Sequence, residues 1–289
     1  MNFEHGGNWA AYEEICGGEV LDFSANVSPF GLQENVREAV IASLKNAHRY
    51  PDPESRELRK AIAQKYELCS GQILCGNGAA DLIYRIVCAV KPRRALVPAP
   101  DFGEYENALR TVGCEISYWE WMRNDRPAQT GSADMIILSN PNNPSGCLHS
   151  PVFLRELADR CEAENILLVV DECFMDFIDC PSDHSLLNFI ADHKNLLVLR
   201  AFTKFYGMAG LRLGWCATSN SELISRMKTA GPPWSVSIPA QAAGIAALSE
   251  DGYSDKVRRL IKAEREHLIS ELRTIGFRVV SGEENYILF

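Results

Sequence analysis

Lys204 and Arg212 stand eight positions apart in a glycine-rich segment, residues 201–214, that follows an apolar run at 195–199 typical of a buried strand. A lysine at the end of such a strand suits an imine with an aldehyde cofactor that carries a phosphate. Burial and a neighbouring cation lower the pKa of an amine, which makes it nucleophilic near neutral pH. Arg212 would hold the phosphate with its planar fork. Most lysine–arginine pairs in glycine-rich loops are solvated, so the rest of the chain must support this interpretation.

Small residues follow a second apolar run, at 72–75, where residues 76–81 read Gly-Asn-Gly-Ala-Ala-Asp and an amphipathic pattern begins. Small side chains at the start of a helix let backbone N–H groups approach a phosphate, and the helix dipole favours the anion. A tight turn with an N-cap is the alternative interpretation.

Two further apolar runs are followed by asparagine or aspartate. The run at 135–139 leads into 140–146, where prolines flank asparagines; such a pattern usually forms only a turn, but here the amide of Asn143 could donate to a phenolic oxygen. The run at 166–170 leads into Asp171, which is either an N-cap or a buried acid with a cationic partner, because an unpaired buried charge is costly. A protonated pyridine nitrogen would be such a partner.

The elements that must position these residues alternate along the chain. Helical periodicity falls at residues 34–47, 54–66, 79–90, 104–112, 151–164, 239–249 and 255–275. Short apolar runs typical of strands fall at residues 72–75, 95–98, 115–119, 135–139, 166–170, 195–199, 213–218 and 277–280. This alternation predicts an open α/β sheet, largely parallel, with helices on both faces. In such sheets ligands gather at the carboxyl ends of the strands.

The composition is that of an ordinary globular protein: 289 residues, 46% hydrophobic and 23% charged. The net charge of −9 argues against non-specific binding of nucleic acid, although a local cluster of cations can still attract a small anionic substrate. The ten cysteines form no C-x-x-C pair, and the sequence predicts no metal site. The start lacks the pattern of a signal peptide, and no apolar stretch approaches the ~18 residues that span a bilayer. We therefore expect a cytoplasmic protein with no membrane partner.

Together the polar strand ends describe a site for pyridoxal 5'-phosphate. Lys204 forms the imine, Asp171 keeps the ring nitrogen protonated so that the ring withdraws electrons, and Asn143 steadies the ring oxygen. The phosphate is held by a further set: Gly78, Ala79, Ala80, Thr203 and Arg212.

With these motifs in this order, the chain resembles the fold-type I pyridoxal-phosphate enzymes, the class I and II aminotransferases, from about His5 to Phe289. The resemblance implies a three-layer α/β/α large domain with a mostly parallel seven-stranded sheet, joined to a small α+β domain. We expect an N-terminal arm and small-domain segment at 1–40, the large cofactor domain at 41–250, and a truncated C-terminal small domain at 251–289.

The resemblance also implies two aromatic contacts to the cofactor. Phe102 occupies the place of the aromatic residue that stacks on the ring, although a core phenylalanine is the alternative interpretation. Tyr50, in the segment 49–53, resembles the tyrosine that reaches the phosphate held by the partner subunit. A homodimer with shared sites is therefore expected.

Two branches of the family compete: the threonine-phosphate decarboxylases of cobalamin synthesis and the histidinol-phosphate aminotransferases. The segments 5–8, 22–31, 171–177 and 203–206 resemble the decarboxylases, with one departure at Ser28, where these often have asparagine. The aminotransferases usually carry, in place of Phe174, a tyrosine that hydrogen-bonds the ring oxygen. Phenylalanine removes that donor.

The resemblance to the decarboxylases places three residues near a small phosphorylated amino-acid substrate: His5, Gly6 and Asn26; a surface position is the alternative for His5. The expected reaction is loss of carbon dioxide from L-threonine O-3-phosphate to give (R)-1-aminopropan-2-yl phosphate. Orientation of the substrate decides between decarboxylation and proton removal.

Two alternatives stay open. One is an aminotransferase of the histidinol-phosphate type. The other is a cofactor-binding protein with impaired catalysis, because family members carry a substrate-binding arginine beyond the point where this sequence stops.

Overall fold

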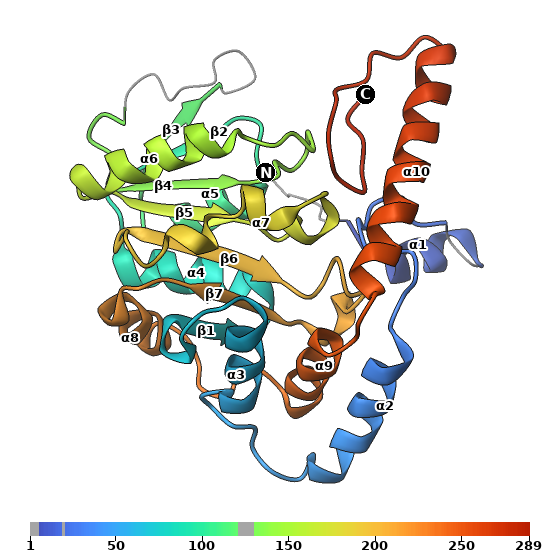
Figure 1. Cartoon of the computed structure of the whole chain (residues 1–289), viewed down its shortest axis with the longest axis horizontal. Helices are drawn as coiled ribbons and strands as arrows, with labels where there is room; N and C mark the ends of the chain where they lie inside the picture. The colour runs from blue at the N-terminus through green and yellow to red at the C-terminus, as the bar shows by residue number, and fades with distance from the viewer. Residues whose placement is uncertain (1–5, 19–20, 121–129) are drawn as a thin grey trace.

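The computed structural model describes residues 6–18, 21–120 and 130–289 (Figure 1). Among these residues seven strands form one sheet, in the order β1-β7-β6-β5-β4-β2-β3. β7 runs antiparallel to both of its neighbours, and the other pairs are parallel. The prediction of a mostly parallel seven-stranded α/β sheet is confirmed. The strands are β1 (Ile73–Gly76), β2 (Arg94–Pro98), β3 (Glu115–Trp119), β4 (Met135–Ser139), β5 (Leu167–Asp171), β6 (Leu196–Ala201) and β7 (Gly214–Ala217).

Helices cover both faces of the sheet. The α-helices are α1 (Trp9–Cys16), α2 (Glu34–Ser43), α3 (Arg56–Lys65), α4 (Gly78–Val90), α5 (Gly103–Thr111), α6 (Pro151–Ala163), α7 (Pro181–His184), α8 (Ser221–Thr229), α9 (Ile238–Leu248) and α10 (Tyr253–Thr274). Short 3₁₀ turns are η1 (Leu44–Asn46), η2 (Ser70–Gln72), η3 (Met175–Phe177), η4 (Leu186–Phe189) and η5 (Ala209–Leu211). Helices α4, α5 and α8 share one apolar core with the sheet, and α3, α6 and α9 share the other.

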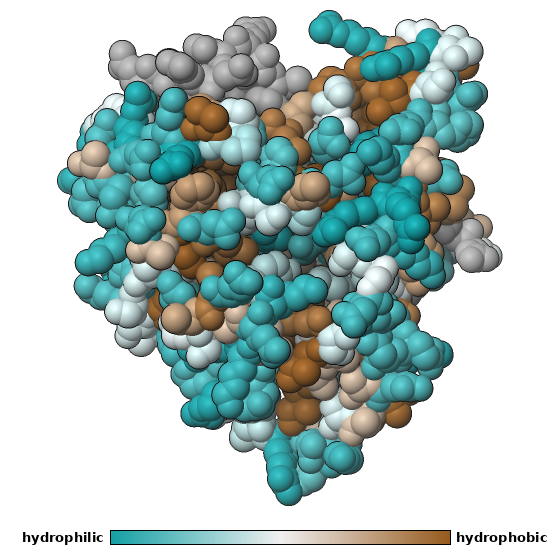
Figure 2. Space-filling view, viewed as in Figure 1, coloured by the Kyte–Doolittle hydropathy of each residue, from teal (hydrophilic) through white to brown (hydrophobic). Residues whose placement is uncertain are grey.

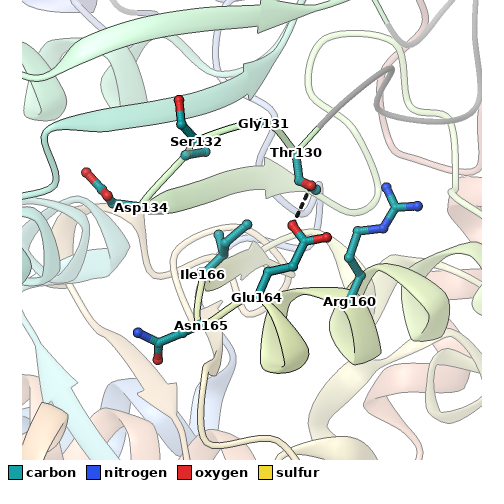
Figure 3. Close-up of a pocket in the computed structure, with 9 residues that line it drawn as sticks. Thr130, Gly131, Ser132, Asp134, Arg160, Glu164, Asn165 and Ile166 are labelled. Atoms are coloured by element: carbon teal, nitrogen blue, oxygen red, sulfur yellow. Dashed lines mark hydrogen bonds between the residues drawn. The ribbon is translucent and has the colours of Figure 1, made fainter.

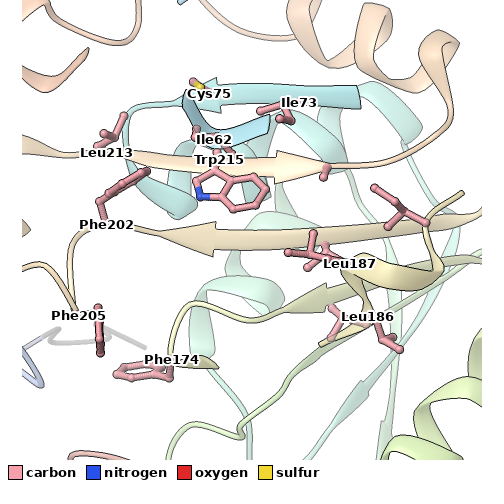
Figure 4. Packing of buried hydrophobic residues seen from close by; sticks show 14 of the residues in the cluster. Ile62, Ile73, Cys75, Phe174, Leu186, Leu187, Phe202, Phe205, Leu213 and Trp215 are labelled. Carbon is pink, nitrogen blue, oxygen red and sulfur yellow. The ribbon is translucent and has the colours of Figure 1, made fainter. Parts of the chain in front are cut away.

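The alternation of side chains along a strand builds these two cores. In β4, Ile136 and Leu138 enter the core beneath α6, whereas Met135 and Ile137 enter the core beneath α4. Every residue of β4 and β5 is buried, as expected of parallel strands covered on both faces. Trp215 of β7 lies in the core beneath α6, beside Leu213 and Phe202, with Phe174 and Phe205 further along the same face (Figure 4).

The last helix stands at one side of the sheet. The chain after α10 turns back and runs alongside it (Figure 1). Arg265 of α10 holds this return, because its guanidinium donates to the carbonyls of Glu283 (2.7 Å) and Glu284 (3.1 Å). In the space-filling view of the same face, apolar residues gather low on the molecule, between α3 and α2 (Figure 2). No helix in the described part of the chain has the length and apolar character needed to cross a membrane.

One predicted element is wrong, and three helices were not predicted. Residues 277–280 form no strand; Val280 donates to the carbonyl of Leu288 (2.9 Å) in an otherwise irregular segment. The apolar run is present there, but no strand of the described sheet pairs with it, and a lone hairpin is marginal. The helices α1, α7 and α8 are at most nine residues long, too short for a clear periodicity.

Candidate active site

A cavity of about 190 Å³ lies where the carboxyl ends of β4, β5 and β6 meet the start of α4. This is the edge of the sheet that the sequence predicts. Most of the predicted cofactor residues line the cavity, together with five residues that were given no role. The lining is Ala79, Ala80, Phe102, Tyr105, Ser139, Asn143, Asp171, Cys173, Phe174, Ala201, Thr203, Lys204, Ala209 and Arg212.

Lys204 follows β6 and turns its amine into this cavity. Burial lowers the pKa of the amine, and the charge of Arg212 lowers it further, while the nearby thiol of Cys173 has the opposite effect. The Nζ atom lies 5.9 Å from the centroid of the Phe174 ring. No carboxylate among the described residues raises the pKa of this amine. The amine is thus available as a nucleophile.

Asp171 is the last residue of β5 and is buried. Its Oδ2 accepts a hydrogen bond from the hydroxyl of Tyr105 (2.8 Å), and its Oδ1 accepts one from the backbone N–H of Cys173 (2.9 Å). Burial raises the pKa of the carboxyl, and the hydrogen bonds from Cys173 and Tyr105 counteract that shift. A carboxylate held by donors in a buried place is suited to a cationic partner.

The start of α4 forms an anion cradle with Arg212. Ala79 and Ala80 in the first turn of α4 line the cavity, and no side-chain cap from Asn77 occupies the N–H groups of that turn. Gly78 has a φ of +80°, and a Cβ placed on it would lie 2.7 Å from Nη2 of Arg212. Only glycine leaves room for the guanidinium at this helix end. Thr203, a buried hydroxyl residue, also lines the cavity.

Aromatic rings and an asparagine surround the rest of the cavity. Phe102 meets Tyr105 edge to face, with 5.6 Å between the ring centroids. Phe174 is buried and meets Tyr286 of the C-terminal segment edge to face at 5.1 Å. The backbone N–H of Asn143 donates to Oγ of Ser139 (3.0 Å), which fixes the loop that carries the Asn143 amide.

These features test whether a phosphorylated pyridine aldehyde fits. An anion cradle, an amine, a buried carboxylate and the aromatic residues Phe102 and Phe174 line one cavity. Such a donor set matches a phosphate, an aldehyde and a ring nitrogen, so the residues present fit pyridoxal 5'-phosphate.

Other predicted residues lie elsewhere. Gly78 abuts Arg212 without lining the cavity, and Tyr50 is 79% exposed and stacks on Trp234 (4.7 Å between centroids). Gly6 and Asn26 do not line the cavity, and His5 lies outside the described residues.

The segment that contains Asn26 nevertheless passes the cofactor lysine. The backbone N–H of Ser28, two residues further along, donates to the carbonyl oxygen of Lys204 (2.9 Å). The expected proximity of Gly6 and Asn26 to a substrate stays a prediction.

Three site residues were missed by the sequence analysis: Tyr105, Ser139 and Cys173. The signal for Tyr105 was its place three residues after Phe102, in the first turn of α5, where a buried phenol requires a partner. Ser139 is the last residue of β4, four positions before Asn143, and Cys173 lies between the predicted residues Asp171 and Phe174.

A second hollow, of about 970 Å³, lies at the opposite end of β4 (Figure 3). Thr130, on the loop before β4, donates to Glu164 after α6 (2.6 Å) across it. Among the described residues that line this hollow, Arg160 is the one cation and none is a lysine or a cysteine. It carries none of the chemistry found at the carboxyl ends of the strands.

Comparison with known proteins identifies the family. Residues 18–289 match the family model for aminotransferase class I and II. The chain belongs to this family. It is 36% identical to the threonine-phosphate decarboxylase of Salmonella typhimurium, across the whole chain and 82% of that protein. It is 31% identical to the histidinol-phosphate aminotransferase of Symbiobacterium thermophilum, across 94% of the chain and 76% of that protein.

A solved structure gives the same assignment. The crystal structure of the histidinol-phosphate aminotransferase from Clostridium acetobutylicum has a TM-score of 0.86 and 31% identity, covering 93% of this chain and 82% of that one. Members of the class I and II family are enzymes that depend on pyridoxal 5'-phosphate, and this chain is an enzyme of that type. The expected family, fold and cofactor are therefore confirmed.

Proposed function

We propose that the protein is a pyridoxal-phosphate-dependent decarboxylase that acts on L-threonine O-3-phosphate. The observation that carries the proposal is a cavity lined by both Lys204 and Asp171, the last residue of β5, within a chain that matches a threonine-phosphate decarboxylase over its full length. The products would be carbon dioxide and (R)-1-aminopropan-2-yl phosphate. The bond between Cα and the carboxylate breaks, its electron pair stays on Cα, and Cα takes up one proton.

The cofactor, when bound, supplies the electron-withdrawing ring that stabilises the pair of electrons left on Cα. The chain supplies the rest. Lys204 attaches the cofactor through its neutral amine, and Asp171 keeps a proton on the ring nitrogen. Arg212 and the first turn of α4 bind the phosphate, and Phe102 and Asn143 orient the ring.

Transfer of an amino group from a histidinol-phosphate-like amine is the second candidate. The 31% identity to two histidinol-phosphate aminotransferases, one of them a solved structure with a TM-score of 0.86, supports it. The two reactions begin from the same cavity, and orientation of the substrate separates them.

The purified protein, loaded with pyridoxal 5'-phosphate, should be incubated with O-phospho-L-threonine, and carbon dioxide and aminopropyl phosphate measured. Release of both supports the decarboxylase. A parallel reaction contains histidinol phosphate and a keto acid. Amino transfer in that reaction, with no carbon dioxide from phosphothreonine, would refute the decarboxylase and support the aminotransferase. A covalently bound cofactor with no turnover of either amine would leave the third expectation, an impaired cofactor-binding protein.

We also propose a homodimer in which Tyr50 serves the partner's site. Tyr50 and Trp234 form an exposed stacked aromatic pair that does not reach the cavity of its own chain, which suits a contact with a second copy. The division into an arm at 1–40, a large domain at 41–250 and a small domain at 251–289 remains part of this proposal. A cytoplasmic location is supported by the ten cysteines, all of them in the described part of the chain and all unpaired.

A further inference from the structure

We propose that Asp101 is a positioning residue that fixes two cofactor contacts, Phe102 and Asn143, with one carboxyl group. The inference rests on the assignment of the cavity to pyridoxal 5'-phosphate and holds for either reaction proposed above. Asp101 lies in the loop between β2 and α5 and was given no role from the sequence.

The first contact runs through the backbone of the residue that follows. Oδ1 of Asp101 accepts a hydrogen bond from the N–H of Phe102 (2.8 Å). This side-chain-to-backbone bond fixes the direction in which the chain leaves the loop and enters α5. The ring of Phe102 lines the cavity, so its place depends on that direction.

The second contact runs through Ser139. The backbone N–H of Ser139 donates to Oδ2 of Asp101 (3.1 Å), and the hydroxyl of Ser139 donates to Oδ1. The carboxyl group therefore joins the loop after β2 to the end of β4. Since a serine hydroxyl has a single hydrogen, its bond to Asp101 leaves both lone pairs to accept.

Those lone pairs hold the asparagine loop. Oγ of Ser139 accepts from the backbone N–H of Asn143 (3.0 Å) and from Nδ2 of Asn142 (3.4 Å). Nδ2 of Asn142 also donates to the carbonyl of Pro100 (3.1 Å), which ties the same two loops a second time. Without Asp101, the Ser139 hydroxyl loses the acceptor that orients its lone pairs toward Asn143.

The experiment compares four variants with the unaltered protein. Asp101→Ala removes all three acceptor contacts, and Asp101→Asn keeps the Oδ1 acceptor for Phe102 and Ser139. Ser139→Ala removes the hydroxyl that links Asp101 to Asn142 and Asn143, and it leaves the bond from the Phe102 N–H to Asp101 in place. The matched control is Asp134→Ala: Asp134 also accepts two backbone N–H groups, from Arg93 (2.8 Å) and Arg94 (3.0 Å), at the opposite end of the same strands.

Two measurements are made: the Kd for pyridoxal 5'-phosphate by fluorescence titration of the apo protein, and amide hydrogen exchange of residues 139–146 without cofactor. We expect Asp101→Ala to raise the Kd about tenfold, which corresponds to about 1.4 kcal/mol, and to speed exchange in the asparagine loop. Asp101→Asn should recover most of the affinity, and Ser139→Ala should speed the same exchange. Asp134→Ala should change neither quantity.

The proposal is overturned if the Kd of Asp101→Ala for the cofactor is within about twofold of that of the unaltered protein. It is also overturned if Asp134→Ala loses as much cofactor affinity as Asp101→Ala. If Asp101→Ala does not fold, Ser139→Ala and Asp101→Asn decide the question through the exchange of the asparagine loop. Because neither readout requires turnover, a protein that decarboxylates nothing but binds the cofactor would refute the proposed reaction and leave this test intact.

Discussion

The hydroxyl of Tyr105 donates to Oδ2 of Asp171 across 2.8 Å, and both side chains are buried. Tyr105 comes from α5 and Asp171 from the end of β5, so the bond joins a helix to the strand end that carries the acid. It leaves the carboxylate with a donor that does not titrate near neutral pH, because burial and the charge of Asp171 raise the pKa of the phenol well above its ordinary value.

Tyr105→Phe should lower turnover about tenfold at neutral pH, since a hydrogen bond to a charged group contributes about 1.5–3 kcal/mol. The hydrogen bond from Tyr105 lowers the pKa of Asp171, so its loss raises that pKa further. The anion is then lost at a higher pH on acidification, and the acid limb of the pH–rate profile should move upward. The control is Tyr84→Phe, whose hydroxyl donates to Glu104 (3.0 Å) outside the cavity. An unchanged acid limb in Tyr105→Phe would refute the role.

Lys204→Ala should abolish covalent attachment of the cofactor and leave the fold intact. Reduction with borohydride followed by intact-mass analysis measures the attachment directly. Lys228→Ala serves as the control, because that amine pairs with Glu54 on the surface. A mass increase that persists in Lys204→Ala would assign the attachment to another lysine.

The strand ends were predictable from the sequence, and the contacts between them were not. Lys204, Asp171 and Asn143 stand out because each comes after a short, largely apolar run, and burial of a run on both faces is a local signal. The pairing of Tyr105 with Asp171, 66 positions apart, depends on the order of strands in the sheet. Residues 277–280 show the converse, since their apolar run suits a strand and none of the described strands pairs with them.

Asp101→Asn should remove part of the pH dependence of stability. Burial and the neighbouring charge of Asp171 raise the pKa of Asp101 to about 8 from the ordinary 3.8, against the effect of its three donors. The folded state therefore holds a proton that the unfolded state releases between these pH values, so the contribution of Asp101 to stability falls as the pH rises from about 4 to about 8. Urea unfolding at pH 5 and pH 8 measures it. Equal pH dependence in the two proteins would contradict the raised pKa.

Arg200→Met should destabilise the fold by about 3–5 kcal/mol, because it leaves two buried carboxylates without their cation. The guanidinium contacts Glu172 (2.8 Å) and Asp176 (3.0 Å), and Glu172 is fully buried. Urea unfolding of the apo protein gives the free energy. The control is Arg56→Met, whose exposed pair with Asp52 should contribute at most about 1 kcal/mol. Equal losses of unfolding free energy in the two variants would show that the buried ion pairs of Arg200 stabilise the fold no more than the pair of Arg56 with Asp52 does.

Gly78→Ala should weaken the phosphate site specifically. Gly78 and Gly252 share a φ of +80°, so an alanine at either position carries a similar backbone strain. At Gly78 the new Cβ would also lie 2.7 Å from Nη2 of Arg212, whereas at Gly252 no atom lies within 4 Å. Both variants should lose similar stability in urea, and only Gly78→Ala should bind pyridoxal 5'-phosphate more weakly, about tenfold, which corresponds to about 1.4 kcal/mol. Equal cofactor affinity in the two variants would mean that Arg212 and the first turn of α4 do not form the phosphate cradle.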